Sequence, residues 1–349
     1  MRTSFQICIL SIVALFVGVA APRVNAQCSA DLNADHSVTA QDLAIILAFW
    51  GPTTTFAAAD INQDQIVNAQ DLAMLLAGWG PCPPADLSWA TVLEQDPNPA
   101  VVTDANFRQR MIATGLPWRV RDNGTGIEML LIPLGTFWMG CTPGDSECGG
   151  EGPVHQVTLT NSYYLGKTEV TQGQWLPIMG SNPSTFQQPA FPSDMTYPVE
   201  SVSWIAIQAF VAATDLRLPT EAEWEYACRA GTTTARYGPA NSIAWHYGNT
   251  CESTIPPSFC GTRPVATKLP NDLGLHDMLG NLAEVCQDWW GPYSSAPATN
   301  PTGPTVGQYH IVRGGGFNFY ADWCTASFRS SLYPDGTASF IGFRVARNP

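Results

Sequence analysis

The sequence predicts an α+β protein with two folded parts, a small all-helical module followed by a larger, irregular domain. Near the N-terminus, two twelve-residue loops rich in Asp, Asn and Gln recur 29 residues apart, and each leads into an apolar helical stretch. Beyond residue 126 the strand signals are short, Gly, Pro and Trp are frequent, and only two stretches have a clear helical pattern. We therefore expect little regular secondary structure in the larger part.

The first 26 residues have the pattern of a secretory signal peptide. Arg2 precedes an apolar run from Ile7 to Ala20, and Val24-Asn25-Ala26 matches a cleavage site. Because that run is too short for a membrane span, we expect an exported protein that does not span the membrane. It would be extracellular, periplasmic or attached to the cell surface. The net charge of −13 and the lack of a basic run argue against nucleic-acid binding.

Nine cysteines follow the signal segment. In an oxidising compartment most of them are expected to form disulfides. Three pairs are favoured by their positions: Cys28 with Cys82 around the repeats, Cys141 with Cys148, and Cys251 with Cys260. Because nine is an odd number, at least one cysteine stays unpaired.

The two N-terminal loops carry oxygen ligands at calcium spacing. Calcium takes about six to eight oxygen atoms, and acids and amides at alternate loop positions supply them. Position 6 of such loops is usually glycine; here it is His36 or Gln65, for which we expect a strained backbone. We expect two calcium ions, with the following ligand positions: Asp31, Asn33, Asp35, Ser37, Thr39 and Asp42 in the first loop, and Asp60, Asn62, Asp64, Ile66, Asn68 and Asp71 in the second.

The loops are followed by helix-patterned stretches, Ala40–Trp50 and Ala69–Trp79, with Gly51 and Gly80 as expected helix stops. Over residues 27–83 this arrangement resembles a type I dockerin.

In the dockerin family, loop positions 10 and 11 help to select the cohesin partner. Both copies here have Ala-Gln, at residues 40–41 and 69–70. The resemblance implies a cohesin partner that can bind in two orientations. A cell-surface scaffold or sorting role without a cohesin is the alternative.

Residues 84–125 are predicted to be a linker with a short helix over Asp104–Thr114. The larger domain then occupies residues 126–349. Its clear helices are predicted over Pro198–Thr214 and Pro219–Ala227.

The second of these helices begins with a capping box, in which Thr220 is the N-cap and Glu223 lies three residues on. We interpret Glu221, Glu223 and Glu225 as capping and solvent-facing residues rather than a hydrolase pair.

Six motifs in the larger domain resemble the formylglycine-generating enzyme (sulfatase-modifying factor) family. They are Gly135–Gly140, Gly166–Thr171, Arg217–Ala227, Gly274–Asn281, Arg313–Gly316 and Gly342–Arg344. The resemblance implies an irregular, C-type-lectin-like fold. It does not by itself establish the chemistry, because one fold supports many functions.

Enzymes of that family oxidise a cysteine of a sulfatase peptide to formylglycine, with oxygen and a copper ion held by two cysteines. The matching positions here are Phe319 and Cys324, so one copper ligand is replaced, and a family serine is replaced by Gly316. Cys324 is the remaining catalytic candidate. Its alternative role is structural, in a disulfide with Cys286 or Cys228.

The resemblance also implies one calcium ion in the larger domain, although Ala283 replaces a family tryptophan within the calcium-binding turn. The implied ligands are the side chains of Asp277 and Glu284 and the carbonyls of Gly280 and Leu282.

Three functional hypotheses remain. The first is a binding or structural member of the family that lacks the copper pair and recognises a glycan or peptide. The second is a formylglycine-generating oxidase that matures exported sulfatases. The third, which depends on the dockerin-like module alone, is an accessory role in polysaccharide degradation.

Overall fold

The computed structural model describes residues 30–32, 37–52, 59–62, 64–81, 86–142, 148–187, 195–251 and 260–349. Within these ranges no helix combines the length and the apolar character that crossing a membrane requires. The predicted signal segment and the predicted Cys28–Cys82 disulfide lie outside the described residues.

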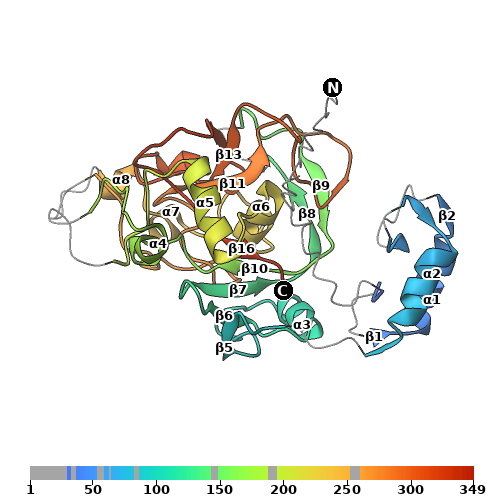
Figure 1. Ribbon diagram of the computed structural model, residues 1–349. Coiled ribbons are helices and arrows are strands. Elements are labelled where there is room, and N and C mark those ends of the chain that lie inside the picture. Colours follow the sequence, from blue (N-terminus) through green and yellow to red (C-terminus); the bar gives the residue numbers. More distant parts are fainter. Residues whose placement is uncertain are drawn as a thin grey trace, which may run out of the picture.

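The N-terminal module contains two matched helices, α1 (Ala40–Ala48) and α2 (Ala69–Ala77) (Figure 1). Both begin with a capping box, in which Asp42 or Asp71 binds back to the N-cap backbone. Both also end earlier than predicted, because the backbone turns before the two glycines that were expected to stop them.

Those glycines instead begin short strands that join the two copies. β1 (Ser37–Val38) pairs with β4 (Gly80–Pro81), and β2 (Gly51–Pro52) pairs with β3 (Ile66–Val67), both antiparallel. The loop of each copy is therefore held to the end of the other copy's helix. The shared core of the module consists of Ala30, Val38, Ile46, Ala59, Val67 and Leu75.

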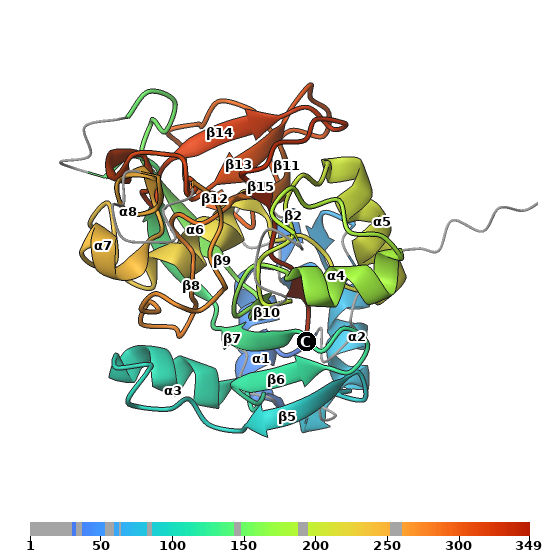
Figure 2. The same ribbon diagram turned by 90° about the vertical axis from the view of Figure 1, so that its left-hand side faces the viewer.

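A five-stranded antiparallel sheet forms one end of the larger domain (Figures 1 and 2). Its strands, in spatial order, are β16 (Ala346–Arg347), β10 (Tyr163–Gly166), β7 (Glu128–Ile132), β6 (Arg119–Asp122) and β5 (Ala90–Glu94). The expected short helix is present as α3 (Ala105–Ala113), and Asp104 caps it. Because β5 and β6 belong to this sheet, residues 90–122 are part of the folded domain rather than a linker.

The other strands described in the larger domain form two smaller sheets. The four-stranded sheet has the order β14 (Arg329–Leu332), β13 (His310–Arg313), β11 (Ala283–Trp289) and β15 (Ile341–Gly342). The three-stranded sheet has the order β12 (Ala298–Thr299), β9 (His155–Leu159) and β8 (Gly135–Met139).

Helix α6 (Glu221–Arg229) lies between these sheets and contacts β8, β11 and β13 (Figure 2). Its predicted capping box is confirmed: the Thr220 side chain accepts from the Glu223 backbone amide, and the Glu223 carboxylate accepts from the Thr220 backbone amide. The other helices are α4 (Gln172–Met179), α5 (Trp204–Thr214), α7 (Ala240–Ile243), α8 (Tyr247–Thr250) and the 3₁₀ segment η2 (Ala321–Trp323).

Helix α5 begins later than predicted. Residues 198 and 199 pair with the segment before α4, where the Val199 amide donates to the Val170 carbonyl at 2.9 Å. Ser203 then caps the helix. The first third of the predicted helix is therefore not helical, and within it Ser201 has a φ of 61°.

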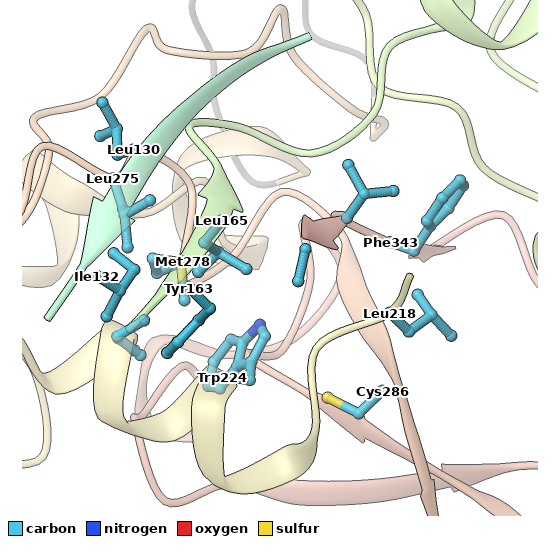
Figure 3. Packing of buried hydrophobic residues seen from close by; sticks show 14 of the residues in the cluster. Leu130, Ile132, Tyr163, Leu165, Leu218, Trp224, Leu275, Met278, Cys286 and Phe343 are labelled. Atoms are coloured by element: carbon cyan, nitrogen blue, oxygen red, sulfur yellow. The ribbon is translucent and has the colours of Figure 1, made fainter. Parts of the chain in front are cut away.

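The core contains both apolar side chains and ion pairs. Trp224 of α6 is fully buried among side chains from all parts of the domain (Figure 3). Glu221 pairs with Arg329 at 2.6 Å, and Glu225 pairs with Arg229 at 2.8 Å and also with Arg313. These two glutamates are therefore buried structural partners, and the prediction that they face solvent was wrong.

Candidate functional site

A glycine-rich turn after β13 passes directly over Cys324. Gly314 and Gly315 have φ angles of 91° and 70°, a conformation that residues with side chains rarely adopt. A Cβ atom at Gly315 would lie 3.0 Å from the sulfur of Cys324. The two glycines of the Arg-Gly-Gly motif are thus required by close packing around Cys324.

Phe319, the residue expected to replace the first copper cysteine, is packed among other rings. Its ring centroid lies 5.5 Å from that of Phe340, 5.7 Å from that of Phe328 and 6.4 Å from that of Trp323. The Phe319 carbonyl also accepts a hydrogen bond from the Tyr247 amide at 2.7 Å. Because a phenyl ring cannot ligate copper, this position cannot complete a two-sulfur site.

The remaining cysteine, Cys324, is fully buried, and burial raises the pKa of its thiol to about 12. The thiolate rather than the thiol is the metal ligand and nucleophile. In this environment Cys324 is a protonated, apolar core residue at neutral pH.

The cysteine predictions divide into two outcomes. The disulfides predicted from short spacing are confirmed: Cys141–Cys148 and Cys251–Cys260. The predicted disulfide between Cys324 and Cys286 or Cys228 was wrong, since all three are free and buried. Cys228 lies on α6 in the apolar core, and Cys286 lies on β11 in the same core (Figure 3). Burial raises the pKa of both thiols well above their usual value.

Aromatic rings around Phe319 extend to the surface. Tyr320 is 62% exposed and Trp323 is 42% exposed, and the ring centroids of Tyr247 and Tyr320 are 5.0 Å apart. Arg236 holds this segment by donating to two of its carbonyls. We call the following residues the aromatic surface: Tyr247, Phe319, Tyr320, Trp323 and Phe340. The buried Phe328 packs against Phe319 and Trp323.

Sequence reasoning did not identify the aromatic surface as a site. The available signal was the density of rings between residues 317 and 323, immediately after the glycine turn. Tyr247 comes from a distant helix and carried no such signal.

The turn predicted to bind calcium is buried, and its two acids have different partners. Both carboxylate oxygens of Glu284 accept from the Arg344 guanidinium at 2.6 Å, and the Trp224 indole donates to it at 2.7 Å. Asp277 accepts from the Ala266 amide at 2.6 Å through Oδ2, whereas Oδ1 has no partner among the described residues. Glu284 therefore does not fit a calcium-ligand role here, because a guanidinium already supplies its positive charge.

The implied carbonyl ligands lie in the same turn, where Gly280 has a φ of 75° and the Leu282 amide donates to Glu169 at 2.9 Å. Glu169, from the Gly166–Thr171 motif, is a third buried acid that contacts this turn. Sequence reasoning missed it, although its place in that motif was the available signal. Burial raises its pKa well above the usual value, and the nearby Asp277 and Glu284 raise it further. Burial also raises the pKa of Asp277 to about 6. Proton uptake and Arg344 can thus balance these charges, and we derive no role for calcium at this turn.

The second N-terminal loop is described at all of its predicted ligand positions. Asp60 accepts from the amides of Asp64 at 3.0 Å and Gln65 at 2.7 Å. Gln65 has a φ of 71°, which confirms the strained backbone predicted at position 6. Asp71, at position 12, is fully buried and accepts from the amides of Asn62 and Asn68. This set of hard oxygen donors suits calcium.

The first loop is described only in part. Asp42 is fully buried and accepts from the amides of Leu32 at 2.7 Å and Thr39 at 2.8 Å, which parallels Asp71. Two predicted ligands, Asn33 and Asp35, and the position-6 residue His36 lie outside the described residues. Across the described ranges, no three Asp, Glu, His or Cys side chains are grouped as they would be around a metal ion.

Two family models match the chain. A model described as sulfatase-modifying factor enzyme 1-like domain matches residues 115–349, and one described as dockerin type I domain matches residues 29–77. A formylglycine-generating enzyme from Mus musculus is 31% identical over 280 residues, which cover 63% of this chain and 74% of that protein.

Two solved structures share the fold. Treponema denticola variable protein 1 matches with a TM-score of 0.56 and 28% identity, covering 64% of this chain and 95% of that one. PvdO from Pseudomonas aeruginosa matches with a TM-score of 0.58 and 24% identity, covering 66% of this chain and 98% of that one. The predicted irregular α+β fold is confirmed.

Proposed function

Because the chain belongs to the sulfatase-modifying factor enzyme 1-like family and also contains a type I dockerin module, we propose that it is an exported binding protein of this family rather than an oxidase. The larger domain would bind an extended ligand at its aromatic surface. The dockerin module, a calcium-binding unit, would attach the protein to a cohesin-bearing partner.

The observation that carries this proposal is the content of the copper position. A phenyl ring occupies one ligand position, and the other holds a buried thiol that keeps its proton. Family chemistry with copper needs two thiolates on one soft ion. The scaffold around this position is intact, so the fold can support recognition without that chemistry.

The aromatic surface fits a glycan ligand best. Exposed Tyr and Trp side chains present apolar faces with polar edges, which suits the mixed apolar and hydroxyl surface of sugar rings. Arg236 and the exposed Asp322, 3.5 Å apart, add polar groups beside these rings. A peptide is the alternative ligand and an outcome of the same test.

The ligand test is a binding screen of the full chain against a glycan array and a peptide library. Binding should be lost in Tyr320→Ala with Trp323→Ala, because these changes remove the exposed rings. Trp138→Ala is the matched control, since Trp138 is 60% exposed on β8, outside the aromatic surface. Equal binding by the double variant and the control would contradict the assignment, and binding of peptides alone would replace the glycan by a peptide.

The oxidase alternative is tested separately. The purified protein is incubated with Cu(I), oxygen and a peptide containing Cys-x-Pro-x-Arg, and mass spectrometry is used to detect the aldehyde. We expect no product. Turnover that disappears in Cys324→Ser would establish the enzyme reading instead.

The dockerin module supports the attachment role through its symmetry. Equivalent side chains of the two copies are exposed to similar degrees: Leu47 at 57% and Leu76 at 53%, and Trp50 and Trp79 both at 49%. A partner could therefore engage either copy with the same contacts. Pull-down with a cohesin panel tests this proposal; calcium-independent capture, or none in calcium, would count against it.

A further inference from the structure

A cavity of ≈ 160 Å³ lies where the segment that precedes the family match meets the larger domain. Its lining residues are Glu94, Asn98, Val101, Trp118, Arg119, Leu130, Lys167, Pro270, Gly274 and His276. Glu94, Asn98 and Val101 precede residue 115, where the family match begins. The family domain alone therefore does not supply all of the cavity's walls.

Three of the lining residues, Glu94, Arg119 and Leu130, belong to neighbouring strands of one sheet. β5, β6 and β7 pair side by side (Figure 1), and the Trp118 amide donates to the Gln95 carbonyl at 2.9 Å. Gly274, with a φ of 87°, closes the opposite side; a Cβ atom there would lie 3.0 Å from Val101 and 3.1 Å from Leu130. The cavity is thus a preformed feature of the fold.

One donor in this lining has no partner. Trp118 is only 3% exposed, and its indole N–H has no hydrogen-bond acceptor within the part of the chain that the structure describes. Leaving such a buried donor unpaired destabilises the folded state. A buried polar group of this kind calls for a water molecule or a ligand oxygen.

The charges around the cavity leave one excess positive charge. Arg119 pairs with Glu94 at 2.6 Å and with Glu128 at 2.7 Å. Arg121 also pairs with Glu128, and Lys167 lies 3.6 Å from the same carboxylate. Three cations thus share two carboxylates, and Lys167, which lines the cavity, has the longest ion-pair distance of the set. This favours an anionic ligand at the Lys167 side.

His276 supplies an acceptor. Its Nδ1 lies 2.9 Å from the Lys268 carbonyl, and because a carbonyl can only accept, Nδ1 carries the hydrogen. In the neutral ring Nε2 is then an acceptor for a hydroxyl group. The lining therefore combines a cation, an N–H donor and a hydroxyl acceptor with the apolar side chains of Val101 and Leu130.

We propose that this cavity binds a small hydroxycarboxylate, in the size class of a single uronic acid. Its carboxylate would pair with Lys167, a hydroxyl would donate to His276, and an oxygen would accept from Trp118. This site is separate from the aromatic surface and does not depend on the function proposed for it.

Isothermal titration of the full chain with D-glucuronate tests the proposal. D-Glucose, which lacks the carboxylate, and acetate, which lacks the ring, are the comparison ligands. Glucuronate should bind at least about tenfold more tightly than glucose, because it adds a charge-assisted contact, and at least about tenfold more tightly than acetate, because it adds the hydroxyl contacts. No binding of glucuronate, or equal binding of glucose, would overturn the assignment.

The chain has two lysines, which provides a matched pair of variants. Lys167→Met should weaken glucuronate binding about tenfold or more. Lys268→Met should not, because it keeps the backbone carbonyl that bonds to His276 and removes only an ammonium that lies over the Trp245 ring, outside the lining. Val101→Phe, which fills the cavity, should abolish binding while thermal melting confirms a folded chain. If glucuronate binding survives Val101→Phe, or changes equally in the two lysine variants, the proposal is wrong.

Discussion

Glu284→Gln tests whether the buried turn depends on its arginine rather than on calcium. Glu284 and Arg344 are both fully buried and share two 2.6 Å hydrogen bonds. Glutamine keeps the volume and can still accept from Trp224 through its one oxygen, but its amide nitrogen cannot accept from Arg344, so the variant loses one charge and one of the two guanidinium hydrogen bonds. Removing one partner of a buried ion pair costs about 3–5 kcal/mol, because the other charge is left uncompensated. We expect the lower end, about 3 kcal/mol, because Glu169 and Asp277 remain close to Arg344.

The assay is urea denaturation of the full chain, followed by the unfolding transition of the larger domain, in calcium and again in EDTA. The loss of unfolding free energy should be the same in both buffers. Adding Arg344→Met to the variant should cost less than the sum of the two single changes, by up to about 3 kcal/mol, because the stranded charge is removed. A loss below about 1 kcal/mol would refute the ion-pair reasoning. A loss seen only in calcium would refute it too and would restore the predicted calcium role.

Three further outcomes are expected. EDTA should lower the melting temperature of the dockerin module, by the equivalent of about 2.7 kcal/mol if calcium is initially at a hundred times its Kd. Asp60→Ala with Asp71→Ala should weaken this calcium response by disabling the second loop. An unchanged calorimetric transition on adding EDTA would contradict calcium-linked folding. Phe319→Cys should not by itself create oxidase activity while Cys324 remains buried and protonated; aldehyde formation in the peptide assay would show that the single replacement is sufficient. Burial, followed by the Glu221 charge, raises the pKa of Asp288 from its usual 3.8 to about 7. The folded state therefore holds this proton more tightly, so the Asp288 contribution to stability is greatest below about pH 4 and is lost as the pH rises through about 7. Denaturation of Asp288→Asn across this range should show a smaller decline than the unmodified chain, and parallel curves would exclude this linkage.

Much of the architecture was predictable because local spacing determines it. The repeated loops place acids and amides at alternate positions of a turn, and the helices after them follow from apolar periodicity and capping boxes. Cys141–Cys148 and Cys251–Cys260 were predictable for the same reason, since short loops bring their ends together without information from elsewhere in the chain.

The errors arose where partners are distant in sequence. Cys324 follows the glycine turn as expected, but whether it reaches Cys286 or Cys228 depends on the packing of separate elements around α6. Residues 90–122 resembled a linker because their strands form only through the pairing of β6 with β7. The predicted helix over Pro198–Thr214 is not helical before α5 begins, because the Val199 amide bonds to the Val170 carbonyl. This tertiary contact overrides local propensity.

The sequence by itself determined that this chain has a duplicated loop-helix module and an irregular family fold. Those conclusions follow from residue identity and short-range spacing. Only the tertiary structure showed that Glu284 forms an ion pair with Arg344, that Cys324 is a buried thiol beneath Gly315, and that Tyr247 packs with the rings around Phe319. The physical reason is that burial and charge pairing depend on which distant segments come together, and in the low dielectric of the core those neighbours decide which groups stay charged or available for a ligand.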